Sequence, residues 1–341
     1  MTCKGHSQPD QKNQAPNALL SFKDLSVTFH GLEGASLVLE KVNLDIMPAE
    51  ILGLVGESGC GKSVLARATL RLLPQPQAEL SGEILFRDEN LLGIDKKRLR
   101  QIRGGEISMI FQEPMTSLNP VFTVGRQMGE VVRLHMGVSK AEARRRCEDM
   151  LRAVNMPDPE GTFAKYPHEL SGGMRQRVMI AMEMSCNPVL LIADEPTTAL
   201  DVTVQGQVLA LLSDMTRSRG VSTLFITHDM GVVAQLCERV AVMYAGKLVE
   251  LVTVAELFHN PLHPYSQGLI AAIPTLSDKR KELPSIPGTV PNFLHPPQGC
   301  RFHPRCKNSA EICRQEVPPL LAYGAHHVAC HRVFEANGAR P

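Results

Sequence analysis

A glycine-rich segment from Gly56 to Ser63 carries the residues with the clearest chemistry. It reads GESGCGKS, which fits the spacing G-x-x-x-x-G-K-S of a phosphate-binding loop. Its glycines let the backbone turn tightly and bring N–H groups close to phosphate oxygens. Lys62 would place a positive charge beside the β- and γ-phosphates of a nucleotide, and the Ser63 hydroxyl would bind Mg²⁺. An ordinary glycine-rich turn is the alternative, so other motifs must decide between the two.

The segments on either side of this loop favour the phosphate-binding interpretation. The apolar run Ile51 to Val55 predicts a buried strand before the loop, and Ser63 to Leu72 predicts a helix after it. A strand, a loop and a helix in this order direct backbone N–H groups and the positive end of the helix dipole at one anion.

Two adjacent carboxylates, Asp194 and Glu195, follow a second apolar run, Val189 to Ala193. Carboxylates at the end of a central parallel strand are costly unless something binds them, and Mg²⁺ with a water is the obvious partner. A structural salt bridge is the alternative. The strand predicted over Thr223 to Ile226 leads to His228, either a contact of the γ-phosphate or an ordinary surface histidine.

Two further segments carry polar groups at the ends of regular elements. A predicted strand, Ile107 to Phe111, ends at Gln112 and a loop made rigid by two prolines. Ser171 is placed to cap a helix that begins near Gly172, and Gly172 and Gly173 leave N–H groups open to an incoming anion.

The overall composition argues against a nucleic-acid-binding protein. Lys and Arg number 36 against 35 Asp and Glu, so the net charge is +1 and no global field draws the chain to nucleic acid. There is no Trp and aromatic residues make up 4%, so stacking platforms for bases are not expected. The sequence contains no run of 18 apolar residues, so it predicts no membrane span. The first residues lack the apolar core of a signal peptide.

The order of the predicted elements gives an α/β fold with a mainly parallel sheet. Strands around Leu25 to Phe29 and Leu37 to Leu44, joined by a hairpin loop at Gly31 to Gly34, predict an antiparallel edge sheet. Phe29 could face an adenine ring or be a core aromatic residue. The predicted organisation is a disordered tail at 1–18, a main domain at 19–260 with a helical subdomain at about 113–175, and an extension at 261–341.

The extension contains four cysteines within 31 residues: Cys300, Cys306, Cys313 and Cys330. Their gaps match neither the C-x-x-C pairs of most zinc ribbons nor the ferredoxin pattern. Four thiolates in a proline-rich, loop-like segment with few core residues would still suit a soft metal or an iron–sulfur cluster that helps the segment fold. Unpaired thiols and disulfides are the alternatives, and His303, His326 and His327 keep zinc open. Elsewhere in the chain, Cys147 fits the apolar face of a helix and is expected in the core.

Taken together, these motifs resemble the ATP-binding subunits of ABC transporters over about residues 20–255. The motifs that stand in the order of that family are the phosphate loop, Gln112, Leu170 to Gly173, Asp194-Glu195, Asp201 and His228. The segments that resemble the dipeptide and oligopeptide importer branch are Phe111 to Pro120, His263-Pro264-Tyr265 and the tail from Pro284 to Cys330. The resemblance implies a P-loop ATPase fold with a mixed, mainly parallel core sheet, an antiparallel edge subdomain, an inserted helical subdomain and a small cysteine-containing extension.

The resemblance also implies roles for individual positions. Glu195 would polarise the attacking water as general base, His228 would contact the γ-phosphate and Glu195, and Gln112 would sense Mg²⁺ and water and link the site to a membrane subunit. Mg²⁺ would be held by Ser63, Gln112 and Asp194, the last through water. The residues expected to bind ATP are Phe29, Gly56, Glu57, Ser58, Gly59, Cys60, Gly61, Lys62, Ser63, Val64 and Asp194. The residues expected to complete the ATP site of a partner cassette are Ser171, Gly172, Gly173 and Asp201.

The implied assembly lies on the cytoplasmic face of the plasma or inner membrane. Its parts are a second ABC ATPase subunit, two transmembrane permeases and an extracytoplasmic peptide-binding protein, without nucleic acid. The resemblance favours a 4Fe–4S cluster over zinc at the four tail cysteines. Relatives in the same branch carry nickel, glutathione or sugars, so other cargoes stay open.

Two positions depart from the family pattern without loss of an essential group. The residue after Ser-Gly-Gly is Met174 rather than Gln, and Phe29 replaces a Tyr but keeps the ring. Two other functions are alternatives to transport, and the sequence fits neither of them well. A soluble ABC protein acting on DNA or ribosomes does not fit one cassette with a neutral charge, and a redox sensor built on the tail cysteines does not explain a complete hydrolytic set.

Overall fold

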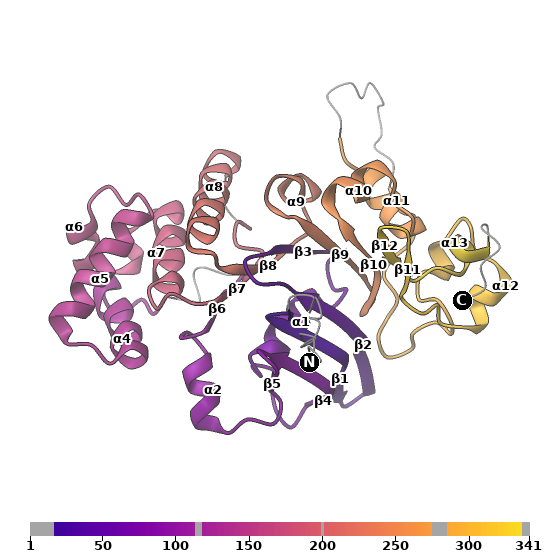
Figure 1. The fold of residues 1–341 in the computed structure, drawn as a ribbon, viewed down its shortest axis with the longest axis horizontal. Helices are drawn as coiled ribbons and strands as arrows, with labels where there is room; N and C mark the ends of the chain where they lie inside the picture. The colour runs from indigo at the N-terminus through magenta and orange to yellow at the C-terminus, as the bar shows by residue number, and fades with distance from the viewer. Residues whose placement is uncertain (1–16, 113–117, 199–200, 275–284, 336–341) are drawn as a thin grey trace, which may run out of the picture.

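The computed structural model describes residues 17–112, 118–198, 201–274 and 285–335 (Figure 1). The disordered tail predicted for 1–18 therefore lies almost wholly outside the described residues, as does the segment from Glu113 to Ser117 after Gln112. The described chain forms two sheets, a group of helices at one end and a small extension at the other (Figure 1).

The smaller sheet is antiparallel and has the strand order β2-β1-β4-β5. The chain turns between its first two strands where Gly31 pairs with Gly34, which confirms the predicted hairpin. Leu25 and Val27 on β1 are buried, while intervening residues are more exposed. The strands are β1 (Leu20–Gly31), β2 (Gly34–Ile46), β4 (Ala78–Phe86) and β5 (Glu89–Asn90).

The larger sheet has the strand order β11-β12-β10-β9-β3-β8-β7-β6. Its part from β9 to β6 is parallel, and β10, β12 and β11 continue it in antiparallel fashion. The strands are β3 (Ile51–Val55), β6 (Ile107–Ile110), β7 (Leu190–Asp194), β8 (Ser222–Thr227), β9 (Arg239–Tyr244), β10 (Lys247–Thr253), β11 (Leu321–Tyr323) and β12 (His326–Val328).

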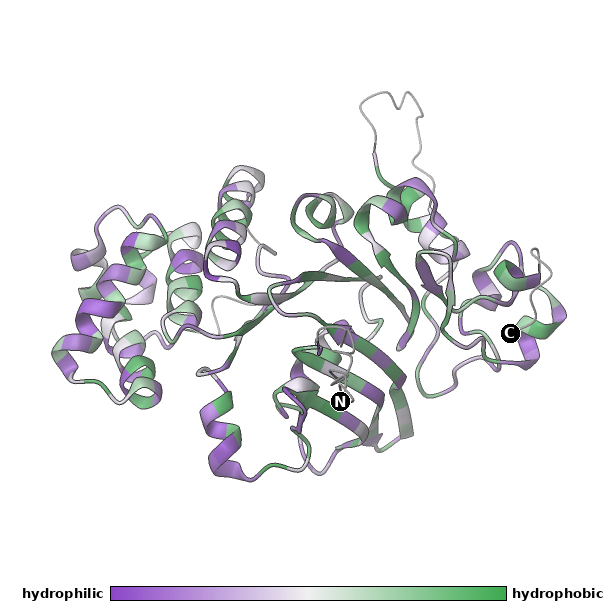
Figure 2. Ribbon diagram, viewed as in Figure 1, coloured by the Kyte–Doolittle hydropathy of each residue, from purple (hydrophilic) through white to green (hydrophobic). Residues whose placement is uncertain are grey.

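Both faces of this sheet are covered. Every residue of β3 is buried, with Ile51 and Val55 in the cluster on one face and Leu52 and Leu54 in the cluster on the other. This alternation is that of a central strand between two apolar layers. Helix α1 (Lys62–Thr69) belongs to the second cluster together with β1 and β2, so it lies between the two sheets. Figure 2 shows the strands mostly hydrophobic and the outer helices α2 (Lys96–Ile102) and α5 (Lys140–Ala153) largely hydrophilic.

The helical subdomain packs as a group beside β6 and β7 (Figure 1). Ser139 caps α5 by accepting from the backbone N–H of Glu142, and Cys147 on α5 is fully buried in the core, as predicted. The helices of this subdomain are α4 (Val124–Met136), α5, α6 (Pro159–Ala164), the 3₁₀ turn η1 (Pro167–Glu169) and α7 (Gly172–Met184). Two further helices, α8 (Val202–Arg219) and α9 (Met230–Leu236), follow strands β7 and β8 of the parallel part of the sheet.

The extension is more regular than its sequence suggests. The proline-rich texture predicts one helix, Tyr265 to Ile273, in a loop-like segment. The structure has a helix at Pro264–Ala271 and loop over 285–302, and it adds short helices and two three-residue strands after that. Strand β12 pairs with β10 and extends the core sheet, because the outer edge of β10 is open to a further strand. Helix α10 (Val254–His259) ends just before the extension. The elements of the extension are α11 (Pro264–Ala271), the 3₁₀ turn η2 (His303–Arg305), α12 (Glu311–Gln315), β11, β12 and α13 (His331–Glu335).

A buried carboxylate joins the extension to the core. Glu250 on β10 is fully buried and accepts from the backbone N–H groups of Leu262 (2.9 Å) and His263 (3.0 Å). His326 on β12 lies 2.7 Å from the same carboxylate through Nδ1. The Glu250 carboxylate thus holds Leu262, His263 and His326 together. These three partners offset the cost of burying its charge.

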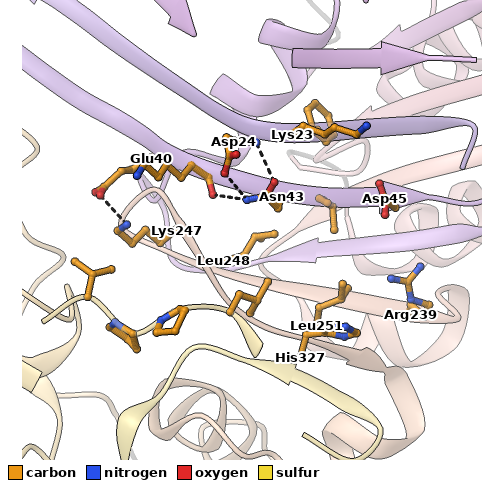
Figure 3. Close-up of a pocket in the computed structure, with 17 residues that line it drawn as sticks. Lys23, Asp24, Glu40, Asn43, Asp45, Arg239, Lys247, Leu248, Leu251 and His327 are labelled. Carbon is orange, nitrogen blue, oxygen red and sulfur yellow. Dashed lines mark hydrogen bonds and ion pairs between the residues drawn. The ribbon is translucent and has the colours of Figure 1, made fainter. Parts of the chain in front are cut away.

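A groove of about 840 Å³ opens where the extension meets both sheets (Figure 3). The Lys247 ammonium crosses it to the Glu40 carboxylate at 2.8 Å, and Asn43 donates to Asp24 at 2.9 Å on the same wall. His327 faces it from β12. The groove is separate from the phosphate loop, and its ion pair ties β2 to β10.

We predict that Glu250→Ala lowers the free energy of unfolding by about 3 kcal/mol, because His326 and two backbone donors lose a buried partner. Urea denaturation measures this difference. Glu256→Ala is the matched control, since Glu256 lies 3.6 Å from His326 with its side chain 36% exposed. It should cost less than about 1 kcal/mol. Equal losses in the two variants would contradict the proposed role of Glu250.

Candidate active site

The phosphate loop runs from the end of β3 to the start of α1, as predicted. Glycine is required at two of its positions. A Cβ on Gly56 would lie 2.2 Å from the carbonyl oxygen of Met243, and one on Gly61, whose φ is +108°, would lie 2.8 Å from the Leu39 side chain. The loop is therefore packed against β9 and β2 closely enough to exclude side chains at these points.

The charged side chain of the loop is held inside its curve. Lys62 is 5% exposed, and its ammonium donates to the carbonyl oxygens of Gly56 at 2.7 Å and Glu57 at 3.0 Å. The thiol of Cys60 lies 3.8 Å from the same ammonium, and burial raises its pKa. Cys60 is thus a small neutral packing residue, and Lys62 is the positive charge available to phosphates.

The first carboxylate of the predicted pair faces the loop. Asp194 ends β7 and accepts from the Ser63 hydroxyl at 3.0 Å, which brings two of the three predicted Mg²⁺ ligands together. The amide of the third, Gln112, donates to Glu195 instead. Burial raises the pKa of Asp194 above its ordinary value, although the hydrogen bond from Ser63 acts in the opposite direction. A buried carboxylate with a raised pKa gains most from a nearby cation, so the donor set suits Mg²⁺.

The second carboxylate gathers the other predicted catalytic residues. Glu195 accepts from Gln112 Nε2 at 3.0 Å and from the Thr198 hydroxyl at 2.9 Å, and His228 Nδ1 lies 3.2 Å away. The backbone of Glu195 has φ of +48°, a left-handed conformation that is uncommon outside glycine and often marks functional sites. Gln112, Glu195 and His228 thus converge as the sequence predicts.

In contrast to Asp194, Glu195 has a pKa below its ordinary value. Burial by itself raises this pKa, but hydrogen bonds from His228 and Thr198 outweigh burial and leave the pKa lowered. Glu195 is therefore ionised at neutral pH. Two neighbouring carboxylates whose pKa values are shifted in opposite directions are typical of sites that give them different tasks.

The Ser-Gly-Gly segment lies at the start of α7, next to the helical subdomain and apart from α1 (Figure 1). Ser171 caps the helix by accepting from the Met174 N–H at 3.3 Å, as predicted, and both Ser171 and Gly172 are exposed. Asp201 is exposed and caps α8 through the Val204 N–H at 2.9 Å. A Cβ on Gly173 would lie 2.8 Å from the Val204 side chain, so the two helix starts pack together.

Phe29 lies on β1, where it is half-buried and packs on the core shared by the antiparallel sheet and α1. This position agrees with the alternative of a core aromatic residue and leaves part of the ring accessible. The adenine contact implied by the resemblance stays a prediction.

The tail cysteines lie around one small pocket. Cys300, Cys306, Cys313 and Cys330 all line it and each is a free thiol. Burial raises the pKa of Cys300 to about 11 and also raises the pKa values of Cys306 and Cys330. Within the described residues, however, no three His, Cys, Asp or Glu side chains are arranged to hold a metal ion. The described side chains are therefore not arranged as a metal site, although the four thiols lie around one pocket, and the iron–sulfur cluster stays a prediction.

The histidines proposed as substitute ligands are divided between different places. His303 lines the cysteine pocket, but His326 is bound to Glu250 and His327 faces the separate groove. The structure does not support a zinc site that uses His326 and His327, because β12 directs these neighbouring side chains to opposite faces and neither lines the cysteine pocket.

Several residues at the site were not found from sequence. Arg305 and Tyr265 both contact Glu57 of the phosphate loop, Thr198 contacts Glu195, and the amide of buried Gln176 donates to the carbonyl oxygen of Pro196. The contact of Arg305 with Glu57 has no local signal, because 248 residues separate the two. Tyr265 belongs to the His263-Pro264-Tyr265 segment, but that segment does not indicate a contact with Glu57, 208 residues away. Gln176 and Thr198 each lie three residues beyond a predicted motif, and the sequence does not show which way their side chains point.

Comparison with known proteins finds matches in two parts of the chain. Residues 39–198 match the family model described as ABC transporter, and residues 249–313 match the model described as oligopeptide/dipeptide transporter, C-terminal region. The chain is 49% identical over 328 residues to a probable peptide ABC transporter ATP-binding protein of Sinorhizobium fredii, covering 95% of this chain and 98% of that one. It is 47% identical over 326 residues to the oligopeptide transport ATP-binding protein OppD of Salmonella typhimurium, covering 95% and 97%.

Solved structures agree with these relatives. The dimeric bacterial ABC transporter cassette MJ0796 superposes with a TM-score of 0.61 at 27% identity, covering 69% of this chain and 98% of that one. The same cassette has been solved in a dimeric post-hydrolysis state bound to ADP and Pi, also with a TM-score of 0.61.

The fold and the site define an ATPase of the P-loop class. The chain belongs to the ABC transporter family of ATP-binding proteins, and its C-terminal region is that of the oligopeptide/dipeptide transporters. The predicted fold class and an ATP hydrolysis activity coupled to transport are thereby confirmed. Among the described residues, no helix is both long and apolar enough to span a bilayer.

We predict that Thr198→Val moves the acid limb of the pH–rate profile for ATP hydrolysis to higher pH. The hydroxyl lowers the pKa of Glu195, so its removal raises that pKa and reduces the ionised fraction at a given acidic pH. Thr216→Val is the control, because the Thr216 hydroxyl bonds only carbonyls within α8. An unshifted acid limb in Thr198→Val, or an equal shift in both variants, would contradict this account of Glu195.

Proposed function

We propose that this chain hydrolyses ATP to drive the import of dipeptides or oligopeptides through a membrane transporter. The observation that supports it most is the convergence of Ser63 with Asp194, and of Gln112 and His228 with Glu195, around the phosphate loop. The peptide cargo is supported by the match of residues 249–313 and by the printed names of the relatives. Nickel, glutathione or sugars are the alternative cargoes within this branch.

In this proposal each residue has one task. The loop amides and Lys62 bind the β- and γ-phosphates, and Ser63 with Asp194 holds the Mg²⁺ of the nucleotide. When Ser63 and Asp194 hold it, this ion would offset the negative charge of the phosphates. Glu195, kept ionised by its hydrogen bonds, orients and deprotonates the attacking water, and His228 on its other side contacts the γ-phosphate. Gln112 connects Glu195 to the segment that follows β6.

The exposed Ser-Gly-Gly segment is proposed to complete the ATP site of a second cassette. Exposed N–H groups at a helix start suit an anion that comes from outside the chain. Two cassettes facing head to tail would then close on two ATP molecules, and closure driven by a ligand is a change that can move a transporter. The proposed assembly adds two permeases and an extracytoplasmic peptide-binding protein and places this chain at the cytoplasmic face of the membrane.

We predict that Glu195→Gln keeps ATP binding and lowers the hydrolysis rate by about 10²- to 10⁴-fold, because the amide cannot take a proton. A coupled assay of phosphate release measures the rate, and a fluorescent ATP analogue measures binding. Glu83→Gln, an exposed carboxylate on β4, is the control and should hydrolyse ATP normally. Hydrolysis at the wild-type rate in Glu195→Gln would remove Glu195 from the role of general base.

We further propose that the four tail cysteines hold a 4Fe–4S cluster. The support is that all four thiols line one pocket although they come from separate elements of the extension. Thiolates are the ligands that such clusters require, and the raised pKa values caused by burial would be reversed on binding iron. The cluster would then stabilise a segment with a small core of its own.

Purification without oxygen tests this cluster. We expect brown protein that contains iron and sulfide in equal amounts, and Cys306→Ser should lose most of both. Cys147→Ala is the control, because Cys147 is buried in the helical subdomain far from the tail. Colourless protein with zinc would favour the zinc alternative, and metal-free protein would favour structural thiols.

A further inference from the structure

The extension reaches the phosphate loop through one arginine. The guanidinium of Arg305, at the end of η2, forms two parallel bonds to the Glu57 carboxylate, 2.7 Å from Nη1 to Oε2 and 3.0 Å from Nη2 to Oε1. The Arg305 side chain is 6% exposed and that of Glu57 is 27% exposed. A bidentate, largely buried pair of this kind fixes direction as well as distance.

The position of Arg305 is itself fixed by the extension. Its Nε donates to the carbonyl oxygen of Pro287 at 2.8 Å, and Nη2 donates to that of Ile286 at 3.1 Å. Nη1 also lies 3.3 Å from the Tyr244 hydroxyl on β9. The guanidinium is therefore directed at Glu57 before any nucleotide binds, because three other contacts would have to break for it to turn away.

A second residue of the extension holds the backbone at the same point. The Tyr265 hydroxyl on α11 accepts from the Glu57 N–H at 2.8 Å. Its ring is fully buried and packs on Tyr244, with centroids 4.7 Å apart, and on Phe302, at 5.4 Å. Glu57 is thus held by both its side chain and its backbone, and both holding groups come from beyond the ABC cassette.

Charge makes this contact relevant to nucleotide binding. Glu57 places a carboxylate on a loop that must accept phosphates, and its own carbonyl oxygen accepts from the Lys62 ammonium at 3.0 Å. An unpaired carboxylate here would repel phosphate oxygens and would be free to draw Lys62 away. Arg305 neutralises that charge and keeps the loop attractive to anions.

We propose that Arg305 and Tyr265 are positioning residues that make the peptide-transporter extension a working part of the ATP site. They act through Glu57, so loss of the contact weakens binding of ATP. This inference rests on the proposed role of the phosphate loop in holding ATP. It also joins the cysteine pocket to the nucleotide, because the short segment that carries Arg305 lies between Cys300 and Cys306.

The test compares two arginines of the same segment. Arg301 is 4% exposed and pairs with Glu40, 26% exposed, at 2.7 Å, but its partners lie on β2 and the β9–β10 turn. Arg305→Gln and Arg301→Gln therefore each remove a buried guanidinium from a half-buried carboxylate. Calorimetric titration of the full chain with a non-hydrolysable ATP analogue gives the Kd, steady-state hydrolysis gives KM and kcat, and thermal unfolding monitors the fold.

We expect Arg305→Gln to raise the Kd and KM for ATP about tenfold with a smaller change in kcat, because the unpaired Glu57 charge opposes phosphate binding. Arg305→Lys, which keeps the charge but not the fork, should fall between Arg305→Gln and wild type. The double variant Glu57→Gln/Arg305→Gln should bind ATP more tightly than Arg305→Gln alone. Arg301→Gln should lower the unfolding temperature and raise the Kd less than Arg305→Gln does, because the Gly246 N–H still holds the loop at the Cys60 carbonyl. Tyr265→Phe, which keeps the ring packing, should weaken ATP binding to a smaller extent.

Two results would overturn the inference by itself: equal Kd values in Arg305→Gln and Arg301→Gln, or a double variant that binds ATP no better than Arg305→Gln. If Arg305→Gln does not fold, the same decision rests on Arg305→Lys and Tyr265→Phe, and wild-type Kd values in both would overturn it. Wild-type protein that does not bind ATP would instead overturn the proposed function and this inference together.

Discussion

The close packing of the phosphate loop against the turn between β9 and β10 is the constraint on which the rest of the site depends. The carbonyl oxygen of Met243 occupies the space where a Gly56 side chain would stand, and the Gly246 N–H donates to the Cys60 carbonyl at 2.8 Å. Gly246 in turn has no room for a Cβ, which would lie 1.9 Å from the carbonyl oxygen of Val38 on β2. Backbone from two other parts of the chain, the β9–β10 hairpin and β2, thus defines the curve of the loop and allows its N–H groups to face phosphates.

The position of the phosphate loop also gives the carboxylates of Asp194 and Glu195 different roles. The loop brings Ser63 to Asp194, and β7 and β8 bring Glu195 to His228. Asp194 is buried and its pKa is raised, which suits a cation, whereas hydrogen bonds lower the pKa of Glu195 and keep it ionised for proton transfer. Two adjacent residues of one strand end therefore acquire different chemistry from their surroundings alone. The same surroundings explain why Glu195 tolerates an uncommon backbone conformation, since several partners hold its side chain.

Much of this arrangement could be predicted from sequence because the motifs carry their own geometry. The spacing of Gly56 to Ser63, the strand-end position of Asp194 and the cap at Ser171 each specify a local structure, and the structure confirms all three. Contacts between distant segments carry no such signal. Strand β12 has three residues, too few to show a period, and its pairing with β10 depends on an edge formed some 75 residues earlier. The contact of Arg305 with Glu57 spans 248 residues, and nothing in either neighbourhood indicates it.

The central claim is that this chain supplies the energy for a peptide importer at the membrane. Its most direct test is a tagged copy of the chain purified from detergent-solubilised native membranes, with all co-purifying proteins identified by mass spectrometry. The account predicts two polytopic permeases and a cassette partner, which is either a second copy of this chain or a sister chain. Recovery only in the soluble fraction, together with nucleic acid or ribosomal proteins, would contradict the account.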